Sequence, residues 1–356
     1  MRRHRIATIP GDGIGPEVVE AALQVLEAAS ARFGFQLAVE RLPYSAEHFL
    51  ATGETLPDRA FEHLKNEADA ILLGAVGDPR VPGNEHARDI LLGLRFKLDL
   101  YINLRPCVLW HPDLTPLKPG QSANRGGEVP AIDFVIFREN TEGQYTGRGR
   151  ITETEYISEE VNTAKGVERI IRAAFEYARA TGRSLVTMSD KSNAIAAHRI
   201  WQSTFKTVAA EYPGIVAEHR YVDALAMELV RDPGRFQVIV TNNLYGDILS
   251  DLGAGLVGGL GLAASANLHP GQRPALFEPV HGSAPPLAGK NVANPFAAVL
   301  TSALMLRELG EADAAAALES AVRDALASGI RTPDLGGTTG TAQAAHWVAA
   351  RVRGLH

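Results

Sequence analysis

The sequence predicts an α/β fold with two domains, and three observations lead to this expectation. Short apolar runs alternate with helical patterns along the whole chain, as in proteins with a substantially parallel sheet. A hydrophobic content of 46% with 21% charged residues is typical of a globular protein. The length of 356 residues exceeds what a single compact core commonly holds, which favours two domains.

Nine segments carry the alternation. Apolar runs bounded by turn residues predict strands, and apolar positions spaced three and four apart predict helices. The expected strands are 5–10, 70–76, 133–137, 184–189 and 237–243, and the expected helices are 16–33, 164–180, 198–212 and 296–309. The segment 112–130, rich in Gly, Pro and Asn, is the best candidate for a crossing between domains.

Composition excludes several classes of protein. A net charge of -6 and a pI near 6.0 argue against a nucleic-acid partner. The single cysteine, Cys107, rules out an internal disulfide and a cysteine-rich metal site, and fits a reducing compartment. The basic start lacks the apolar run of a signal peptide, and the apolar stretch 252–268 is Gly-rich and short for a membrane span. We therefore expect a cytoplasmic enzyme.

Two glycine motifs raise the question of a dinucleotide site. GDGIGPE (11–17) follows a strand and precedes a helix, but Pro16 replaces the third glycine of a Rossmann fingerprint. Gly253, Gly255 and Gly258 have the fingerprint spacing, yet LYGDILSDL separates them from the preceding strand. We interpret these three glycines as a helix-packing segment and not as a Rossmann site.

Charged residues form two candidate constellations. Asp247 and Asp251 are four apart, so on a helix they share a face and suit Mg²⁺; a solvated helix face is an equally good reading. Arg95, Arg105 and Arg138 border apolar runs, where a guanidinium group is costly to bury unless it meets a carboxylate or phosphate. Internal salt bridges are the alternative for each arginine.

Proton transfer and nucleotide binding have their own candidates. Lys191 could act as a base if its neighbours lower its pKa, and Tyr145 could donate a proton, although such residues are commonly structural. The loop 277–295, FEPVHGSAPPLAGKNVANP, crowds backbone N–H groups that suit an anionic ligand, while Pro285 and Pro286 remove two donors.

Taken together, these motifs resemble the β-decarboxylating dehydrogenases, which act on isocitrate, homoisocitrate, 3-isopropylmalate, or D-malate and tartrate. The resemblance spans nearly the whole chain and rests on eight motifs in the family's order: GDGIGPE, NLRP, RENTEGQY, DKSNA, YVDALAM, NNLYGDILSDL, FEPVHGSAP and TPDLGG. It implies an isopropylmalate-dehydrogenase-like two-domain fold with a mixed central sheet, distinct from a Rossmann fold. It also implies a homodimer whose active sites are shared across the interface.

The resemblance assigns residues to roles. Residues 1–105 with 258–356 would bind the cofactor, and 106–257 would hold substrate and metal and form the dimer. Lys191, from the partner chain, would act as base, and Tyr145 would deliver a proton to C3 after CO₂ leaves. Mg²⁺ or Mn²⁺ would bind Asp247 and Asp251 together with Asp223 of the partner chain. The substrate carboxylates would meet Arg95, Arg105 and Arg138.

Substrate choice in this family resides before the first arginine, here in ARDILLGLR. Isocitrate enzymes have Ser in place of Asp89 and Asn in place of Leu91, so isocitrate is disfavoured. Leu91 and Leu92 resemble the leucine pair of 3-isopropylmalate enzymes, but Arg88 replaces their Glu. RENTEGQY and SANLHP resemble the D-malate/tartrate group. We therefore expect a D-malate/tartrate-like substrate, with 3-isopropylmalate, or a malate carrying an unusual substituent such as a phosphonate, as the alternative.

The cofactor expectation is NAD. NAD-using members have Asp after HGSAP and NADP-using members have Lys and Tyr, whereas this chain has Pro286 and Leu287. TPDLGG resembles the NAD group and lacks readers for a 2′-phosphate. The residues expected to bind NAD are Glu278, His281, Gly282, Ser283, Ala284 and Asn294. Two rival classes stay open: a catalytically silent regulatory subunit, and a Rossmann-type dehydrogenase that needs no metal and releases no CO₂.

Overall fold

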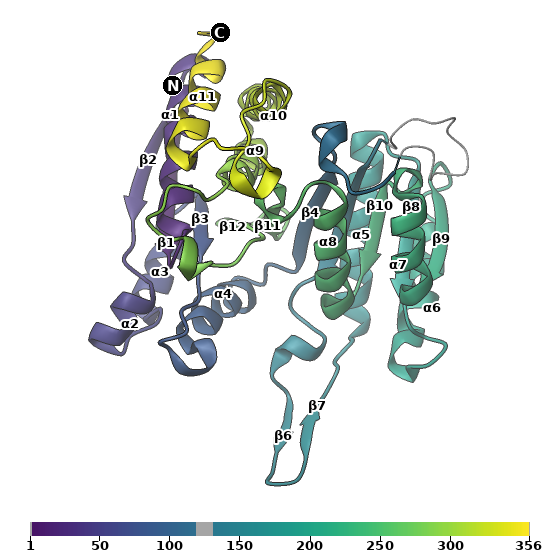
Figure 1. The fold of residues 1–356 in the computed structure, drawn as a ribbon. Coiled ribbons are helices and arrows are strands. Elements are labelled where there is room, and N and C mark those ends of the chain that lie inside the picture. Colours follow the sequence, from purple (N-terminus) through teal and green to yellow (C-terminus); the bar gives the residue numbers. More distant parts are fainter. Residues whose placement is uncertain (1, 119–130, 356) are drawn as a thin grey trace. The chain divides into compact units, whose positions relative to one another are not determined.

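The computed structural model describes residues 2–118 and 131–355, and the chain divides into two compact units. The first unit comprises residues 1–100 and 258–356, and the second comprises residues 101–257 (Figure 1). The segment 112–130, which we expected to connect the domains, instead belongs to the second unit, and its residues 119–130 lie outside the described part.

The first unit has a mixed sheet. Three neighbouring pairs of its strands are parallel and the last pair is antiparallel. In spatial order the strands are β2 (Phe35–Arg41), β1 (Arg2–Gly11), β3 (Ala70–Ala75), β12 (Ala275–Pro279) and β11 (Ala264–Leu268). The helices are α1 (Gly15–Phe33), α2 (Ala46–Thr52), α3 (Asp58–Glu67), α4 (Glu85–Lys97), α9 (Phe296–Glu308), α10 (Ala312–Ala327) and α11 (Thr341–Arg353).

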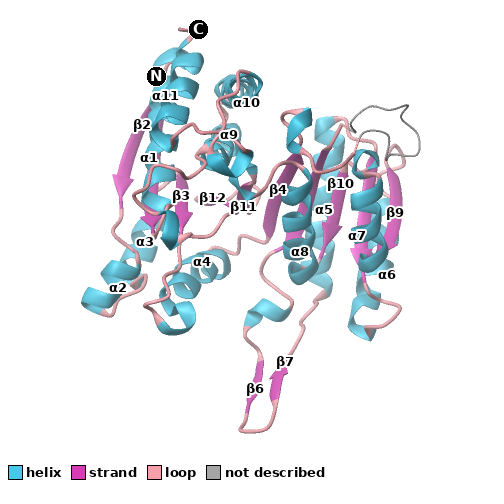
Figure 2. Ribbon diagram, viewed as in Figure 1, coloured by secondary structure: helices cyan, strands magenta, loops and turns pink. Residues whose placement is uncertain are grey.

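The second unit also has a mixed sheet, with one antiparallel pair followed by parallel pairs. Its strands, in spatial order, are β4 (Ile102–Val108), β5 (Asp133–Glu139), β10 (Val238–Thr241), β8 (Leu185–Asp190) and β9 (Val216–Tyr221). Its helices are α5 (Ala164–Thr181), α6 (Arg199–Ala209), α7 (Val222–Arg231) and α8 (Asn243–Leu256). In Figure 2, α8 lies in front of these strands and α5 lies behind them.

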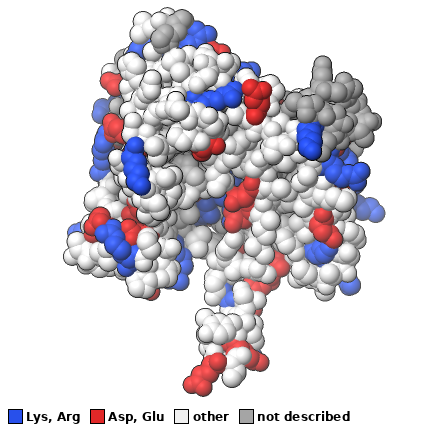
Figure 3. Space-filling view, viewed as in Figure 1, with Lys and Arg blue, Asp and Glu red and all other residues white. Residues whose placement is uncertain are grey.

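A hairpin extends from the second unit. Its strands β6 (Gly149–Ile151) and β7 (Tyr156–Ser158) pair with each other in a separate antiparallel sheet. Ile151 and Tyr156 are 73% and 80% exposed, which is unusual for large apolar side chains. The tip of the hairpin is acidic, as Figure 3 shows at the bottom of the view.

The predicted elements form for recognisable reasons. Helix α1 has Pro16 in its first turn and ends at Gly34, which adopts the left-handed conformation that favours glycine. Strands β3 and β10 are buried along their whole length because helices cover both faces, which explains their continuous apolar runs. No helix in the described part of the chain is long and apolar enough to cross a membrane.

The rejection of a Rossmann site agrees with the structure. Gly253 and Gly255 lie inside helix α8, not in a turn between a strand and a helix. A Cβ on Gly253 would come within 2.6 Å of the Cys107 sulfur on β4, so this glycine lets the helix pack closely on the strand. The helix-packing interpretation is therefore confirmed at Gly253.

Candidate active site

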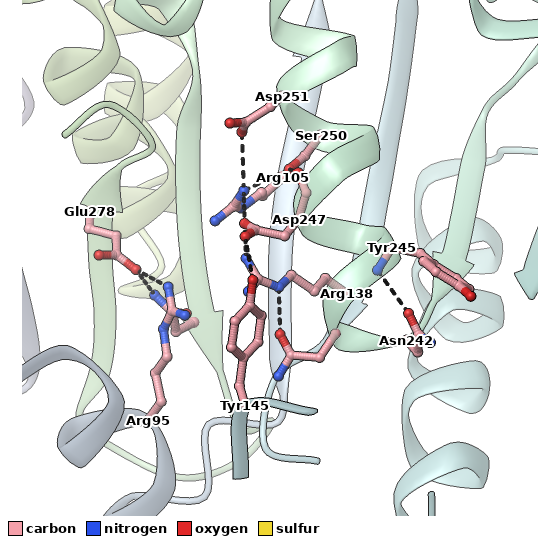
Figure 4. Close-up of polar contacts among 12 residues, drawn as sticks. Arg95, Arg105, Arg138, Tyr145, Asn242, Tyr245, Asp247, Ser250, Asp251 and Glu278 are labelled. Atoms are coloured by element: carbon pink, nitrogen blue, oxygen red, sulfur yellow. Dashed lines mark hydrogen bonds and ion pairs between the residues drawn. The ribbon is translucent and has the colours of Figure 1, made fainter. Parts of the chain in front are cut away.

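Helix α8 provides the two carboxylates of the second unit. Its first backbone N–H groups are capped by Asn242, whose side-chain oxygen accepts from the amide of Tyr245 at 2.9 Å. Asp247 and Asp251 follow one helical turn apart and project from the same side, as Figure 4 shows. The predicted shared face is therefore present.

Two arginines on neighbouring strands meet this face. In the register of β4 and β5, Asn103 lies opposite Arg138, so Arg105 is diagonal to Arg138 on the same face of the sheet. The Nη1 atom of Arg138 lies 2.5 Å from Oδ1 of Asp247, and Nη1 of Arg105 lies 3.1 Å from the same oxygen. Both side chains are buried, and each makes a charge-assisted hydrogen bond to this carboxylate through one Nη1 atom.

Neighbouring side chains hold the arginines in place. Arg105 donates to the Ser250 hydroxyl at 2.6 Å, and Nε of Arg138 donates to Oδ1 of Asn243 at 2.9 Å. Gly246 lies against Arg138, and a Cβ added there would come within 2.6 Å of its Cβ and Cγ. Sequence reasoning missed Asn243 and Ser250, although both lie in the motif NNLYGDILSDL.

Tyr145 joins the same cluster. Its hydroxyl donates to Oδ2 of Asp247 at 3.0 Å, and the Arg138 guanidinium lies 5.4 Å from the centre of its ring. Burial, followed by the negative charge of Asp247, raises the pKa of Tyr145. The phenol therefore stays protonated and has a proton to donate.

The chemistry of the carboxylates fits a divalent cation. Burial raises the pKa of Asp251; the charge of Asp247 adds to this effect and Arg105 opposes it. A cation between the carboxylates of Asp247 and Asp251 would relieve the repulsion between their charges. Carboxylate oxygens are ligands that Mg²⁺ and Mn²⁺ accept. Within the described residues, however, no group of three or more His, Cys, Asp or Glu side chains is placed to hold a metal. One chain thus contributes Asp247 and Asp251 without a third carboxylate.

Lys191 and Asp223 form a second cluster. Lys191 follows β8, Asp223 lies in the first turn of α7, and Nζ of Lys191 is 2.7 Å from Oδ2 of Asp223. Tyr245, two residues before Asp247 on α8, belongs to this side, because its ring lies edge-on to that of His198 at 5.5 Å between ring centres and His198 accepts a hydrogen bond from the amide of Lys191. Positions two apart on a helix are separated by about 200°, and Figure 4 shows Tyr245 and Asp247 on opposite sides of α8. The Lys191 cluster, on the side of Tyr245, therefore lies across the helix from Asp247.

In the first unit, Arg95 is engaged by Glu278. Nη2 of Arg95 lies 2.6 Å from Oε1 of Glu278, both side chains are buried, and Asn267 donates to the same oxygen at 3.0 Å. Figure 4 shows this pair. Sequence reasoning placed Arg95 on the substrate and Glu278 on the cofactor; the structure brings them together as an internal ion pair.

The residues expected to select the substrate lie on α4. Arg88, Leu91, Leu92 and Arg95 are spaced three and four apart, so they lie along one side of the helix. Leu91 packs on the core of the first unit. Arg88 is 65% exposed, and its Nε lies 3.7 Å from Oδ1 of Asp89, which partly balances its charge.

The cofactor loop is built on the GDGIGPE turn. The amide of Ile14 donates to the Ser283 carbonyl at 2.8 Å, and a Cβ on Gly13 would lie 1.9 Å from that oxygen. Ala284 has a positive φ of 39°, which turns the chain sharply before Pro285. The glycine motif therefore supports the loop that contains Gly282, Ser283 and Ala284.

A second segment anchors the end of the loop. Asn294 donates to Oδ2 of Asp334 at 3.0 Å, and Thr341 donates to the Ala293 carbonyl at 2.6 Å. His281 has a buried Nε2 atom without a hydrogen-bond partner among the described residues, and burial lowers its pKa, which keeps the ring neutral. An orphaned acceptor in a loop rich in N–H groups suits a nucleotide with hydroxyl and amide donors. Asp334 was not singled out from sequence.

Comparison with known proteins fits this geometry. Residues 5–348 match the family model described as isocitrate/isopropylmalate dehydrogenase. The chain belongs to this family. A 3-isopropylmalate dehydrogenase from Streptomyces coelicolor is 46% identical over 99% of both chains, and one from Streptomyces griseus is 48% identical over 90% of this chain and 92% of the relative.

A solved structure agrees with the family assignment. The isocitrate dehydrogenase of Methylococcus capsulatus has a TM-score of 0.83 and is 40% identical, with 98% of this chain and 99% of that chain covered. The protein is a decarboxylating dehydrogenase that acts on a CH–OH group, as expected. Members of the isocitrate/isopropylmalate dehydrogenase family use NAD and a divalent metal such as Mg²⁺ or Mn²⁺.

Proposed function

We propose that this family member oxidises and decarboxylates 3-isopropylmalate. The observation that carries the proposal is that relatives 44–48% identical, spanning at least 90% of the chain, are 3-isopropylmalate dehydrogenases. The side of α4 that presents Leu91 and Leu92 supports it, since two leucines suit an isopropyl group. Arg88 is balanced by Asp89, which weakens the argument for an anionic substituent. The D-malate/tartrate reading from sequence is therefore replaced by its alternative.

We infer roles for the side chains of the second unit. Arg105 and Arg138 bind the substrate carboxylates, exchanging part of their contact with Asp247 for substrate oxygens. Lys191 takes the proton of the 2-hydroxyl as hydride leaves C2. The C3–carboxylate bond then breaks to release CO₂, and its electron pair is protonated at C3 by Tyr145, whose raised pKa keeps that proton available. Arg95, which the resemblance assigned to a third carboxylate, lies in the first unit, where its guanidinium is paired with Glu278.

The cofactor and the metal ion have places in this scheme. NAD would lie along the loop from His281 to Asn294, with Glu278, Gly282, Ser283 and Ala284, and accept the hydride. A divalent ion would bind Asp247 and Asp251 and stabilise charge on the substrate oxygens. Pro286 and Leu287 offer no side-chain hydrogen bond to a ribose, so we expect weaker discrimination against NADP than an acidic residue would give.

A second copy of the chain would complete the site. Lys191 and Asp223 lie across α8 from Asp247, so a single chain does not gather the whole catalytic set on one side. Apolar side chains for an interface are exposed on α7 and α8, where Met227, Val230 and Ile248 are 51%, 44% and 57% exposed. The hairpin adds Ile151 and Tyr156. We therefore propose a homodimer in which each active site uses residues of both chains. We also propose that it acts in the cytoplasm.

The test is NADH formation with Mg²⁺ and each of 3-isopropylmalate, D-malate, L-tartrate and isocitrate. We expect the highest kcat/KM for 3-isopropylmalate, loss of activity with EDTA, and recovery with Mg²⁺ or Mn²⁺. A higher kcat/KM for D-malate would restore the D-malate/tartrate reading. Absence of turnover with every acid, in protein that still binds NAD, would favour the silent-subunit class. Turnover without CO₂ would contradict decarboxylation.

A further inference from the structure

His198 and Glu160 form a buried hydrogen-bonded pair next to the backbone of Lys191. His198 has no exposed side-chain surface, and the Glu160 side chain is 13% exposed. Nε2 of His198 lies 2.7 Å from Oε1 of Glu160, and the backbone amide of Lys191 lies 3.1 Å from Nδ1 of His198. No role proposed above uses either residue. The hydrogen bond from the backbone of Lys191 to His198 connects this buried pair to the proposed base.

The hydrogen bonds determine the form of the imidazole. A backbone N–H can only donate, so Nδ1 of His198 must accept from Lys191 and carries no proton. The proton of the neutral ring is then on Nε2, where it is donated to Glu160. This tautomer is assigned from its partners. It makes His198 a fixed acceptor for the amide of Lys191.

Glu160 is itself held by several donors. Asn242 and Asn162 donate to its Oε1 atom at 3.1 and 3.2 Å. Burial alone would raise the pKa of Glu160, but the hydrogen bonds from His198, Asn162 and Asn242 hold it below its ordinary value, so it stays ionised as an acceptor. Because Asn242 caps α8, this network connects the turn after β8 to the start of α8.

The residues on either side of Lys191 are restrained as well. Oδ1 of buried Asp190 accepts from the amide and hydroxyl of Ser192 and lies 2.8 Å from Nε2 of His219. The backbone of Lys191 is thus held at its own amide by His198 and at the next residue by Asp190. Fixing the backbone sets the point from which the flexible four-carbon side chain of Lys191 extends, and the contact of Nζ with Asp223 then limits where Nζ lies.

We propose that His198, oriented by Glu160, is a positioning residue for Lys191 in proton transfer. The inference rests on the proposed role of Lys191 as base. With the amide held, Nζ lies 2.7 Å from Asp223 and is directed to one place. Without the acceptor, the turn shifts, and a displacement of about 1 Å of a reacting group can lower a rate by roughly 100-fold.

Two substitutions separate the two contacts of the ring. In His198→Asn, the side-chain oxygen occupies nearly the position of Nδ1 and can still accept from Lys191, but the contact with Glu160 is lost. In His198→Gln, the longer amide can donate to Glu160 but offers no acceptor to Lys191. Both variants are compared with the wild type, and with Lys191→Ala, for kcat, KM and Tm, using NAD, Mg²⁺ and whichever acid the wild type turns over best.

We expect His198→Gln to lower kcat by about 100-fold with KM within about twofold, and His198→Asn to retain kcat within about fivefold. A purely structural role would lower Tm in both variants and give no such difference in kcat. Equal losses of kcat in the two variants, or wild-type kcat in the Gln variant, would overturn the inference. If the Gln variant does not fold, a loss of about 100-fold in folded His198→Asn overturns it instead.

The same experiment separates this inference from the proposed function. Normal turnover by Lys191→Ala would remove the role of the lysine as base, and with it the reason for positioning it. Loss of turnover in Lys191→Ala, together with equal effects of the two His198 variants, would contradict positioning alone. Loss in Lys191→Ala with the expected Asn–Gln difference supports both.

Discussion

At Gly246, α8 approaches the strand that carries Arg138 so closely that a Cβ would lie 2.6 Å from the arginine side chain. The stem of the arginine cannot move away without disturbing its contacts with Asn243 and Asp247. This glycine is therefore needed for the geometry of the site as well as for packing. Asn243 and Asp247, on the same helix, both contact Arg138, so a shift of the arginine would disturb both contacts.

We expect Gly246→Ala to cost about 1–3 kcal/mol of stability and to lower kcat/KM at least about tenfold, because Arg138 must shift. Gly255→Ala in the same helix is the matched control. No described atom outside the local helix backbone lies within 4 Å of a Cβ there, so this substitution should stabilise the helix by roughly 0.5–1 kcal/mol. Chemical denaturation and steady-state kinetics of both variants test the prediction, and equal behaviour would contradict it.

Glu139, beside Arg138 on β5, provides a pH-dependent prediction. Burial raises its pKa to about 7, against the lowering effect of hydrogen bonds from Thr141 and Glu142. The folded state therefore binds more protons than the unfolded state between about pH 4.5 and 7. The contribution of Glu139 to the free energy of unfolding is fully present below about pH 4.5 and is lost as the pH rises through about 7. The total change is roughly 3 kcal/mol.

Glu139→Gln should remove this slope. Urea denaturation at intervals from pH 5 to 8 should show the wild type losing stability with rising pH relative to the variant. The exposed Glu153→Gln on the hairpin should follow the wild type. A variant curve parallel to that of the wild type would mean that Glu139 titrates at its ordinary pKa.

Among single residues, sequence could identify donors and carboxylates but not their partners. Arg95 and Glu278 are 183 positions apart, and only the folded first unit shows that they pair. His198 has no local pattern that marks it, because its partners Glu160 and Lys191 come from different loops. Asp247 and Asp251 were predictable because helical periodicity alone places them on one face.

At the scale of elements, α4 links local pattern to substrate choice. Its buried positions His86, Ile90 and Leu94 face the core, while Leu91 and Leu92 lie further round the helix. Leu92 is half-buried and, unlike Leu91, is not part of the packing of the described core cluster. It is therefore the better position at which to test contact with an isopropyl group.

We expect Leu92→Ala to raise KM for 3-isopropylmalate by about tenfold, since loss of apolar contact in a pocket is worth roughly 1–3 kcal/mol. KM for D-malate, which has no isopropyl group, should change little. Leu50→Ala, at an exposed position on α2, is the control and should leave both values unchanged. An equal rise in KM for both acids would indicate that Leu92 does not contact the substituent.

All nine predicted elements are present, with boundaries that differ by a few residues. The elements not named from sequence have weaker signals. Strand β4 contains Arg105 and Pro106, which interrupt the continuous apolar run by which a buried strand is recognised in sequence. The reversal of β11 against β12 depends on a turn that no apolar periodicity encodes. Short helices such as α2 depend on the Ser45 cap more than on an amphipathic pattern.

At the scale of the whole molecule, each unit contributes five strands of mixed orientation, and each contains part of the candidate site. The first unit holds the loop from His281 to Asn294 on the GDGIGPE turn, and the second holds the carboxylates, arginines and lysine. The resemblance in sequence order predicted the family because eight motifs distributed over the chain constrain both units at once. It could not predict the side of α8 on which each group lies.

Lys191 and Asp247 lie on opposite sides of α8, and this separation allows a complementation test between two inactive variants. If Lys191 serves the carboxylates of another subunit, two inactive chains can repair each other. A dimer of one Lys191→Ala chain and one Asp247→Asn chain contains one site with all its groups and one lacking both. Mixing the two variants by unfolding and refolding should restore about a quarter of wild-type activity, from half the dimers with half their sites intact. Silence of the mixture, despite exchange seen by mass spectrometry, would confine each site to its own chain.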